Sequence, residues 1–275
     1  MEALTEPAKA RESTAPVLSV VVPTRNEAHS VGPLMLRLAA ALGDYAHEVI
    51  FVDDSDDGTD GVLQDLAENL YPQLRVLHRF SGERADGLSG AVIEGFRTAR
   101  GAFVAVIDAD LQHPPELLPR MLDELQARDV DIVIASRYLG DGSADGLADP
   151  GRRLASRATA FGTRLLFAER VRGITDPASG YFVMRRSLLE DIHLRPLGYK
   201  ILLEVLMRTP WRTAYEVPYR FSEREADASK ASLRQGVIFL RHCVRLLREI
   251  PAAGMFWKLG LAAGALVAIT RLFRR

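Results

Sequence analysis

The sequence has little cysteine, almost no net charge and no apolar leader, and each absence narrows the class of protein. A single cysteine, Cys243, cannot form an internal disulfide, which fits a reducing compartment. The formal net charge of -1 over 275 residues disfavours a nucleic-acid-binding protein with a broad basic face. Residues 1–15 carry charges and lack an apolar run, so we expect no signal peptide.

The charge is unevenly divided along the chain, although it nearly cancels overall. Residues 230–275 contain nine Lys and Arg against one acid, Glu249, so the rest of the chain is acidic. A basic tail on an acidic body indicates contact with a membrane or another anionic surface.

The tail contains two segments that we expect to be helical. Residues 231–250 place Arg241, Arg245 and Arg248 on one face and apolar side chains on the other, as in a helix on an anionic membrane surface. An ordinary surface helix is the alternative. Residues 252–269 are apolar apart from one lysine and lie near the minimum of about 17 residues for a membrane span. A short span, an embedded helix and a terminal core helix all fit this segment.

Short apolar runs alternate with helical patterns through the body of the chain. Such alternation predicts an α/β fold with a mostly parallel sheet covered by helices on both faces. A further helix, strand and helix are expected between residues 152 and 208. The other expected strands are residues 18–22, 48–52, 74–78, 103–107, 131–135 and 213–217.

Polar motifs follow several of these strands, where ligands bind in open α/β sheets. Asp108, Asp110 and Gln112 follow the fourth strand and offer the oxygen ligands that Mg²⁺ or Mn²⁺ prefers. Such an ion would hold the diphosphate group of a bound substrate. The Asp-x-Asp spacing alone is weak evidence, because it recurs at residues 54–56 and 129–131. The second recurrence precedes a strand and therefore belongs to the opposite edge of the sheet.

The acids after the first two strands have two interpretations. Asp53 and Asp54 suit a turn with short polar side chains, and they equally suit hydrogen bonds to a nucleotide. Glu27 fits either a helix cap or a contact to a base. No Gly-x-Gly-x-x-Gly turn follows the first strand, which argues against a dinucleotide-dependent oxidoreductase.

Three motifs follow one another along the chain: Pro-Thr-Arg-Asn-Glu at 23–27, Val-Asp-Asp-Ser-x-Asp-Gly-Thr at 52–59 and Asp-Ala-Asp-Leu-Gln-His-Pro-Pro-Glu at 108–116. Taken in order, they resemble glycosyltransferase family 2, and within it the dolichyl- and polyprenyl-phosphate mannose synthases. Further matches stand at residues 136–138, 153–156, 176–181 and 198–204, so the resemblance spans roughly residues 17–250. It implies a GT-A fold, a Rossmann-like nucleotide-sugar domain over residues 17–230. A disordered segment (1–16) would precede this domain, and a membrane-associating tail (231–275) would follow it.

The resemblance also implies roles for individual residues. The nucleotide pocket would be lined by Pro23, Arg25, Glu27, Val52, Asp53 and Asp54. The diphosphate and its metal would lie at Asp108, Ala109, Asp110 and Gln112. Arg137 would meet the phosphates, and Arg153 with Ser156 would lie where the acceptor phosphate is expected. Arg224 and Lys230 would stand on a flexible segment that closes over the donor.

The expected activity is metal-dependent, inverting transfer of a hexose to a polyprenyl or dolichyl phosphate. The expected donor is GDP-mannose, the catalytic residues are Asp110, Arg137 and Arg153, and the expected location is the cytoplasmic face of the cell membrane. Two alternatives stay open. One is a family 2 transferase that uses another sugar, such as UDP-glucose, or a non-lipid acceptor. The other is a catalytically silent, membrane-bound subunit that binds sugar nucleotides.

Overall fold

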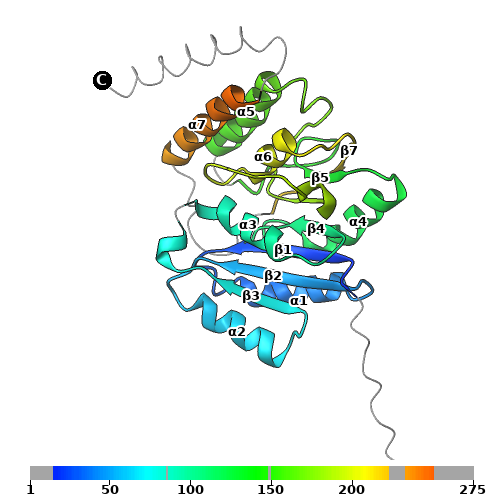
Figure 1. Ribbon diagram of the computed structural model, residues 1–275, viewed down its shortest axis with the longest axis vertical. Coiled ribbons are helices and arrows are strands. Elements are labelled where there is room, and N and C mark those ends of the chain that lie inside the picture. The colour runs from blue at the N-terminus through cyan, green and yellow to red at the C-terminus, as the bar shows by residue number, and fades with distance from the viewer. Residues whose placement is uncertain (1–14, 85, 148–149, 223–232, 251–275) are drawn as a thin grey trace, which may run out of the picture.

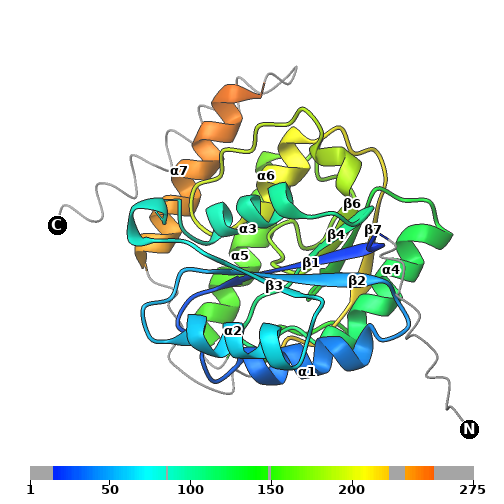
Figure 2. The same cartoon turned by 60° about the horizontal axis from the view of Figure 1, so that its bottom comes forward.

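The centre of the molecule is a seven-stranded sheet with helices on both faces (Figures 1 and 2). The computed structural model describes residues 15–84, 86–147, 150–222 and 233–250. The strands are β1 (Leu18–Thr24), β2 (His47–Asp53), β3 (Leu74–His78), β4 (Phe103–Val106), β5 (Ile132–Ser136), β6 (Phe182–Arg185) and β7 (Ala214–Pro218). The helices are α1 (Val31–Ala41), α2 (Thr59–Asn69), α3 (Gly87–Thr98), α4 (Leu118–Ala127), α5 (Pro150–Leu166), α6 (Ile201–Arg208) and α7 (Leu233–Glu249), with short 3-10 turns η1 (Ser81–Glu83), η2 (Pro115–Leu117) and η3 (Arg186–Leu189).

Two apolar cores lie on the two faces of the sheet, because alternate residues of a strand point to opposite faces. On one face, α1, α2 and α4 pack on side chains such as Val20 and Phe51. On the other face, α3, α6 and α7 pack on neighbours such as Val21 and Ile50. Strands buried on both faces need continuous apolar runs, which explains why the strands were visible in the sequence.

The strand order β3-β2-β1-β4-β6-β5-β7 contains a change of direction beside β1. The chain runs from β1 outward to β3 and then returns to place β4 on the other side of β1, with β1 pairing in parallel with both β2 and β4. A crevice at such a switch point, outside the carboxyl ends of the strands, is where open α/β sheets bind ligands. The motifs after β1 and β4 therefore meet at the expected place.

One strand departs from the parallel pattern. β6 pairs antiparallel with both β4 and β5, whereas β5 and β7 are parallel. The start of β6 therefore lies at the same edge of the sheet as the ends of β4 and β5. The predicted mostly parallel α/β sheet is confirmed, and residues 175–181, which precede β6, join the ligand-binding edge.

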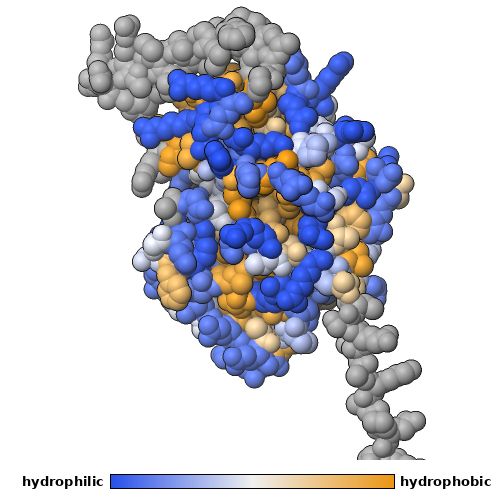
Figure 3. Space-filling view, in the orientation of Figure 1, coloured by the Kyte–Doolittle hydropathy of each residue, from blue (hydrophilic) through white to orange (hydrophobic). Residues whose placement is uncertain are grey.

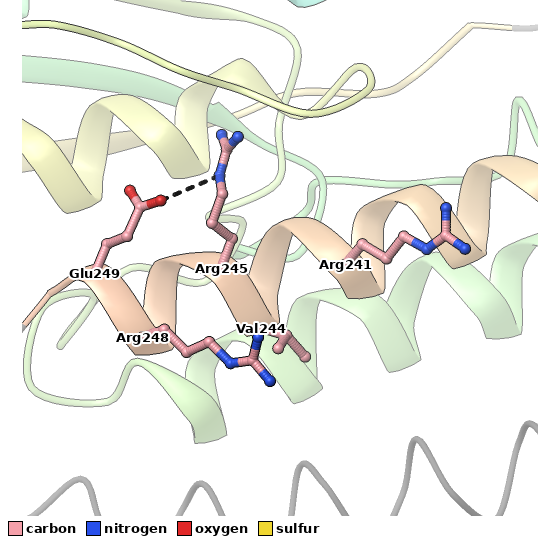
Figure 4. A pocket seen from close by; sticks show the side chains of 5 residues that line it. All are labelled: Arg241, Val244, Arg245, Arg248 and Glu249. Atoms are coloured by element: carbon pink, nitrogen blue, oxygen red, sulfur yellow. Dashed lines mark ion pairs between the residues drawn. The ribbon is translucent and has the colours of Figure 1, made fainter.

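The helices α5 and α7 run side by side at one end of the molecule (Figures 1 and 4). Three large apolar side chains of α5 are exposed: Leu154, Phe161 and Leu165. The predicted helix over 231–250 is observed as α7, while the predicted apolar segment 252–269 and the N-terminal residues 1–14 lie outside the described residues. Within the ranges described above, none of the helices combines the length and hydropathy that crossing a membrane requires.

Candidate active site

The loops after β1 and β2 are joined to each other by hydrogen bonds. The Asn26 N–H donates to Ser55 Oγ at 2.7 Å, and the Asp56 N–H donates to Asn26 Oδ1 at 3.0 Å. Asn26 has a left-handed backbone, with φ of 53°, which asparagine adopts more readily than most residues. The N–H of the buried Glu27 donates to Thr59 Oγ1 at 3.2 Å. These bonds fix the loop after β1 against the start of α2.

The two acids at the end of β2 are both buried and both bonded to protein groups. Asp53 Oδ1 accepts the Ser55 hydroxyl at 2.5 Å, and Asp53 Oδ2 lies 2.8 Å from His78 Nδ1. Both carboxylate oxygens of Asp54 accept hydrogen bonds from Arg79, at 2.8 and 2.6 Å. Asp53 therefore holds the turn, while Asp54 and Arg79 form a bidentate ion pair.

Arg79 is a candidate site residue that the sequence reasoning missed. It directly follows β3 and also donates to Asp86 Oδ1 at 2.9 Å and to the Gly87 carbonyl at 2.9 Å. Burial opposes its charge, but the hydrogen bonds to Asp54 and Asp86 raise the pKa of Arg79 above its ordinary value. Its position directly after a predicted strand was the feature of the sequence that could have identified it. Of the other residues predicted for the nucleotide pocket, Arg25 is exposed, whereas Pro23 and Val52 are buried within strands.

The first acid after β4 is held by a buried histidine. Asp108 Oδ2 lies 3.2 Å from His113 Nε2, and the other ring nitrogen of His113 lies 3.0 Å from the Tyr219 hydroxyl. Gly180 packs against this pair so closely that a Cβ there would stand 3.0 Å from Asp108 Oδ2. The carboxylate is therefore oriented from two sides while it remains partly exposed.

The charge of Asp108 is favoured by its surroundings. Burial raises the pKa of this carboxyl, but the hydrogen bond from His113 and the positive charges of Lys200 and Arg137 outweigh burial and lower the pKa. An ionised carboxylate at the end of β4 is the form that binds a divalent cation.

Asp110 and Gln112 add two further candidate oxygen ligands after β4. The Gln112 N–H donates to Asp110 Oδ1 at 3.2 Å across the turn at Leu111, whose φ of 62° is left-handed. Gln112 Nε2 donates to the Ser222 carbonyl at 3.0 Å, which leaves the Gln112 Oε1 atom for another partner. The buried Ala109 stands between the two acids.

These donors fit a hard divalent cation. Among the described residues there is no group of three or more His, Cys, Asp or Glu side chains that could hold a metal ion. Two carboxylates and one amide oxygen are the incomplete set expected where substrate phosphates supply the remaining ligands of Mg²⁺. The donor chemistry of Asp108, Asp110 and Gln112 is therefore compatible with Mg²⁺ or Mn²⁺.

A buried ion pair follows β5. The Arg137 guanidinium donates to both oxygens of Asp176, at 2.7 and 3.0 Å. The Asp176 N–H donates in turn to Glu216 Oε1 at 3.0 Å. Burial opposes the charge of Arg137, but attraction to Asp176 raises the pKa of Arg137, so the guanidinium stays charged. Arg137 thus lies where the sequence placed it, at a strand end, with its orientation fixed by Asp176.

Within the part of the chain that the structure describes, no contact joins Arg153 to Asp108 or Asp110. It lies in the first turns of α5, more than a third exposed, and pairs with Asp145 at 3.5 Å. Ser156, which shares its motif, does reach the β5 edge, since its hydroxyl lies 2.6 Å from the Tyr138 hydroxyl. Arg224 and Lys230, the other predicted cations, lie outside the described residues.

Lys200 is the second residue that the sequence reasoning did not assign to the site. It immediately precedes α6, and its Nζ donates to the Ala178 carbonyl at 2.9 Å and lies 4.7 Å from the centre of the Tyr199 ring. Burial, followed by repulsion from Arg137, lowers the pKa of Lys200 to about 8, although Asp176 and Asp108 act in the opposite direction. Its motif was recognised in the sequence, but nothing there placed the side chain among the strand ends.

A basic surface lies on α7. Arg241, Arg245 and Arg248 line a pocket of about 590 Å³ together with Val244 and Glu249 (Figure 4). None of the residues at the strand ends lines this pocket. The opposite face of α7 is buried in the core through Cys243, Leu246 and Leu247. In Figure 3, apolar and polar side chains are interleaved at this end of the molecule.

The chain resembles characterised proteins over most of its length. It is 36% identical over 249 residues to the dolichol-phosphate mannosyltransferase of Pyrococcus furiosus, covering 89% of this chain and 68% of the relative. It is 36% identical over 221 residues to the undecaprenyl-phosphate mannosyltransferase of Micrococcus luteus, covering 77% of this chain and 86% of the relative.

A solved structure shares the fold. It is glucosyl-3-phosphoglycerate synthase from Mycobacterium tuberculosis in complex with Mn²⁺, UDP-glucose and glycerol 3-phosphate, with a TM-score of 0.58, 20% sequence identity and coverage of 87% of this chain and 82% of that one. At this identity the likeness concerns the fold alone. Residues 19–193 match the family described as glycosyl transferase family 2. The chain therefore belongs to glycosyltransferase family 2 and is a glycosyltransferase.

Proposed function

We propose that the protein transfers mannose from GDP-mannose to a polyprenyl phosphate at a membrane surface, with the help of Mg²⁺ or Mn²⁺. The observation that carries the proposal is the meeting of opposite charges at one edge of the sheet. The ionised Asp108 after β4 lies within electrostatic reach of Arg137 after β5 and of Lys200 before α6. The names of the relatives in Pyrococcus furiosus and Micrococcus luteus support the lipid phosphate as acceptor and mannose as the sugar.

The nucleotide would lie over the ends of β1 and β2. There the Arg25 side chain is exposed, and the buried Asp54–Arg79 ion pair provides fixed polar groups. Pro23, Val52 and Asp53 would support this pocket from within the strands, and Glu27 would face it from the start of the loop. The diphosphate would then reach β4, the next strand of the sheet, where Asp108, Ala109 and Asp110 stand.

A divalent ion held by Asp108, Asp110 and Gln112 would neutralise charge on the leaving diphosphate. The acceptor is already anionic near neutral pH and needs little help from a general base. An oxygen of the lipid phosphate forms a bond to the anomeric carbon, and the bond to the diphosphate breaks with its electron pair. This displacement inverts the anomeric carbon. Arg137 offsets the repulsion between the two phosphate groups, and Arg153 would bind the acceptor if α5 brings it closer in the complex.

The two helices at the end of the molecule would bring the enzyme to its lipid substrate. The exposed Leu154, Phe161 and Leu165 of α5 offer apolar side chains, and the arginines of α7 offer positive charge beside them. Apolar insertion combined with attraction to anionic lipids is how surface helices bind membranes. We propose the cytoplasmic face of the membrane, with residues 17–230 as the catalytic domain and 231–275 as the membrane-associating tail.

The test is a donor and acceptor panel with the purified full-length chain. Labelled GDP-mannose and UDP-glucose are each incubated with a short-chain polyprenyl phosphate, with Mg²⁺ or Mn²⁺, and the lipid product is extracted and counted. We expect mannosyl lipid from GDP-mannose only. Glucosyl lipid formed from UDP-glucose would show that the transferred sugar is glucose and not mannose. Donor binding without any transfer would instead indicate a catalytically silent binding subunit.

A further inference from the structure

Residues 176–180, which lead into β6, contact three side chains of the candidate site. Asp176 holds the Arg137 guanidinium, the Ala178 carbonyl accepts the Lys200 ammonium at 2.9 Å, and Gly180 lies against Asp108. One stretch of five residues therefore fixes the Arg137, Lys200 and Asp108 side chains beside one another.

Among these groups, Lys200 has the least compensated charge. The charged Arg137 is paired with the carboxylate of Asp176. Lys200 forms no ion pair within the described part of the chain, where its ammonium donates to the neutral Ala178 carbonyl. A half-buried ammonium without a carboxylate partner is costly, and this cost lowers its pKa. An ammonium has three donors, so two remain for the oxygens of an anionic ligand.

The strand order indicates which anionic substrate group lies nearest to Lys200. The proposed nucleotide lies over β1 and β2, and the proposed diphosphate lies at β4. Lys200 is bonded to the segment before β6, which is on the opposite side of β4 from β1. Direct displacement requires the attacking oxygen and the leaving diphosphate to lie on opposite sides of the reacting carbon. The ammonium is therefore on the side from which an acceptor would attack.

The loop before Lys200 also faces the helix that we assign to the membrane. The Leu197 N–H donates to Nδ1 of His242 on α7 at 3.1 Å, and a Cβ on Gly198 would stand 2.9 Å from Ile238 Cγ2. Lys200 is thus carried by a segment that is packed tightly on α7, close to where a lipid acceptor would arrive.

We infer that Lys200 binds the phosphate of the polyprenyl acceptor and is a further catalytic residue of the transfer. This inference rests on the proposed function for the identity of the acceptor. The ammonium moves no proton. It holds the attacking phosphate while that phosphate forms its bond to the anomeric carbon and the nucleoside diphosphate leaves with the electron pair of the broken bond.

Three substitutions separate this role from support of residues 176–180. Lys200→Gln keeps a donor for the Ala178 carbonyl and removes the charge, Lys200→Met removes both, and Lys200→Arg keeps the charge. Arg97→Gln is the matched control, since it removes an exposed cation of α3 that pairs with Glu94. Initial rates are measured against both substrates with a short-chain polyprenyl phosphate in detergent, so that membrane docking does not limit the rate.

We expect Lys200→Gln and Lys200→Met to raise the acceptor KM by about tenfold or more, the loss typical of one charge-assisted hydrogen bond. The donor KM should stay within about twofold, and Lys200→Arg should recover part of the acceptor affinity. A rise in the donor KM in place of the acceptor KM would overturn the inference. It would also be overturned if Lys200→Gln left the acceptor KM unchanged and only Lys200→Met lost activity.

A binding measurement keeps the two proposals distinguishable. Calorimetric binding of the short-chain polyprenyl phosphate to the wild-type chain and to Lys200→Gln, both saturated with GDP and Mn²⁺, requires no turnover. Weaker binding to Lys200→Gln supports the role of Lys200 even if the wild-type chain transfers no mannose, which would refute the proposed function alone. Equal binding to the two proteins refutes the role of Lys200 even if mannose is transferred.

Discussion

The Arg79 guanidinium donates to both carboxylate oxygens of Asp54, at 2.8 and 2.6 Å, and both side chains are buried at the carboxyl end of β2 and β3. This pair makes Asp54 rigid before any nucleotide arrives. Pre-organised polar groups bind a ligand without the entropic cost of ordering them first. The planar shape and the charge of the Arg79 guanidinium should therefore affect the affinity for the nucleotide-sugar donor.

Arg79→Lys is expected to weaken binding of GDP-mannose by about tenfold, because a point charge cannot replace the planar fork that fits a carboxylate. Calorimetry with GDP and Mn²⁺ measures this loss. The control is Arg97→Lys on the exposed surface of α3, whose pair with Glu94 is solvated and contributes little. Nucleotide affinity that is equal in Arg79→Lys and the control would show that the pair serves folding only.

Gly180→Ala is expected to lower kcat/KM by about tenfold, because a Cβ at this position would stand 3.0 Å from Asp108 Oδ2 and displace the carboxylate by a few tenths of an ångström. The apparent affinity for Mn²⁺, measured by titrating the metal into the assay, should fall as well. Gly162→Ala on α5 is the matched control, since a Cβ there meets no heavy atom within 4 Å. Unchanged metal dependence in Gly180→Ala would separate Asp108 from the metal.

The strands and the edge that carries the site could be predicted from the sequence. Buried strands are continuous apolar runs, so the expected strands at residues 18–22 and 103–107 match β1 and β4 to within a few residues. The antiparallel position of β6 between β4 and β5 could not be predicted, because the apolar pattern of a strand says nothing about its neighbours in the sheet.

The same limit explains the residues that were missed. Asp54 and Arg79 are 25 positions apart, and Arg137 and Asp176 are 39 apart, so their pairing depends on the tertiary fold. Lys200 does not follow a strand but directly precedes a helix, so its place in the sequence did not indicate the site. Its hydrogen bond to the Ala178 carbonyl places it there. Motif spacing identifies residue types with the right chemistry, whereas their partners come from the packed structure.

A buried histidine on α7 predicts that acid destabilises the fold. Burial, followed by repulsion from Arg245 and Arg208, lowers the pKa of His242 from 6.5 to about 4. Glu249 acts in the opposite direction, as does the buried Glu204, whose Oε2 lies 3.4 Å from His242 Nε2. The unfolded chain therefore binds the proton more tightly than the folded chain. This contribution to stability is complete above about pH 6.5 and is lost as the pH falls towards 4, which amounts to about 2 kcal/mol between pH 7 and 5.

Urea unfolding at pH 7 and pH 5 measures this change. His242→Gln keeps an acceptor for the Leu197 N–H and removes the titration, so its free energy of unfolding should depend less on pH over this interval. His193→Gln, which replaces a histidine on the exposed surface, is the matched control. The same pH dependence in His242→Gln as in the wild-type chain would exclude His242 as the cause.

We propose that the acids after β4 hold a divalent ion, which in turn holds the sugar diphosphate. The most direct measurement is mannosyl transfer from GDP-mannose to a short-chain polyprenyl phosphate by metal-stripped enzyme, with and without added Mn²⁺, in the wild-type chain and in Asp110→Asn. We expect no product without metal, full recovery on adding Mn²⁺ to the wild-type chain, and a loss of at least about a hundredfold in Asp110→Asn at any metal concentration. Equal turnover by the stripped and loaded enzyme, or an Asp110→Asn variant as active as the wild-type chain, would contradict it.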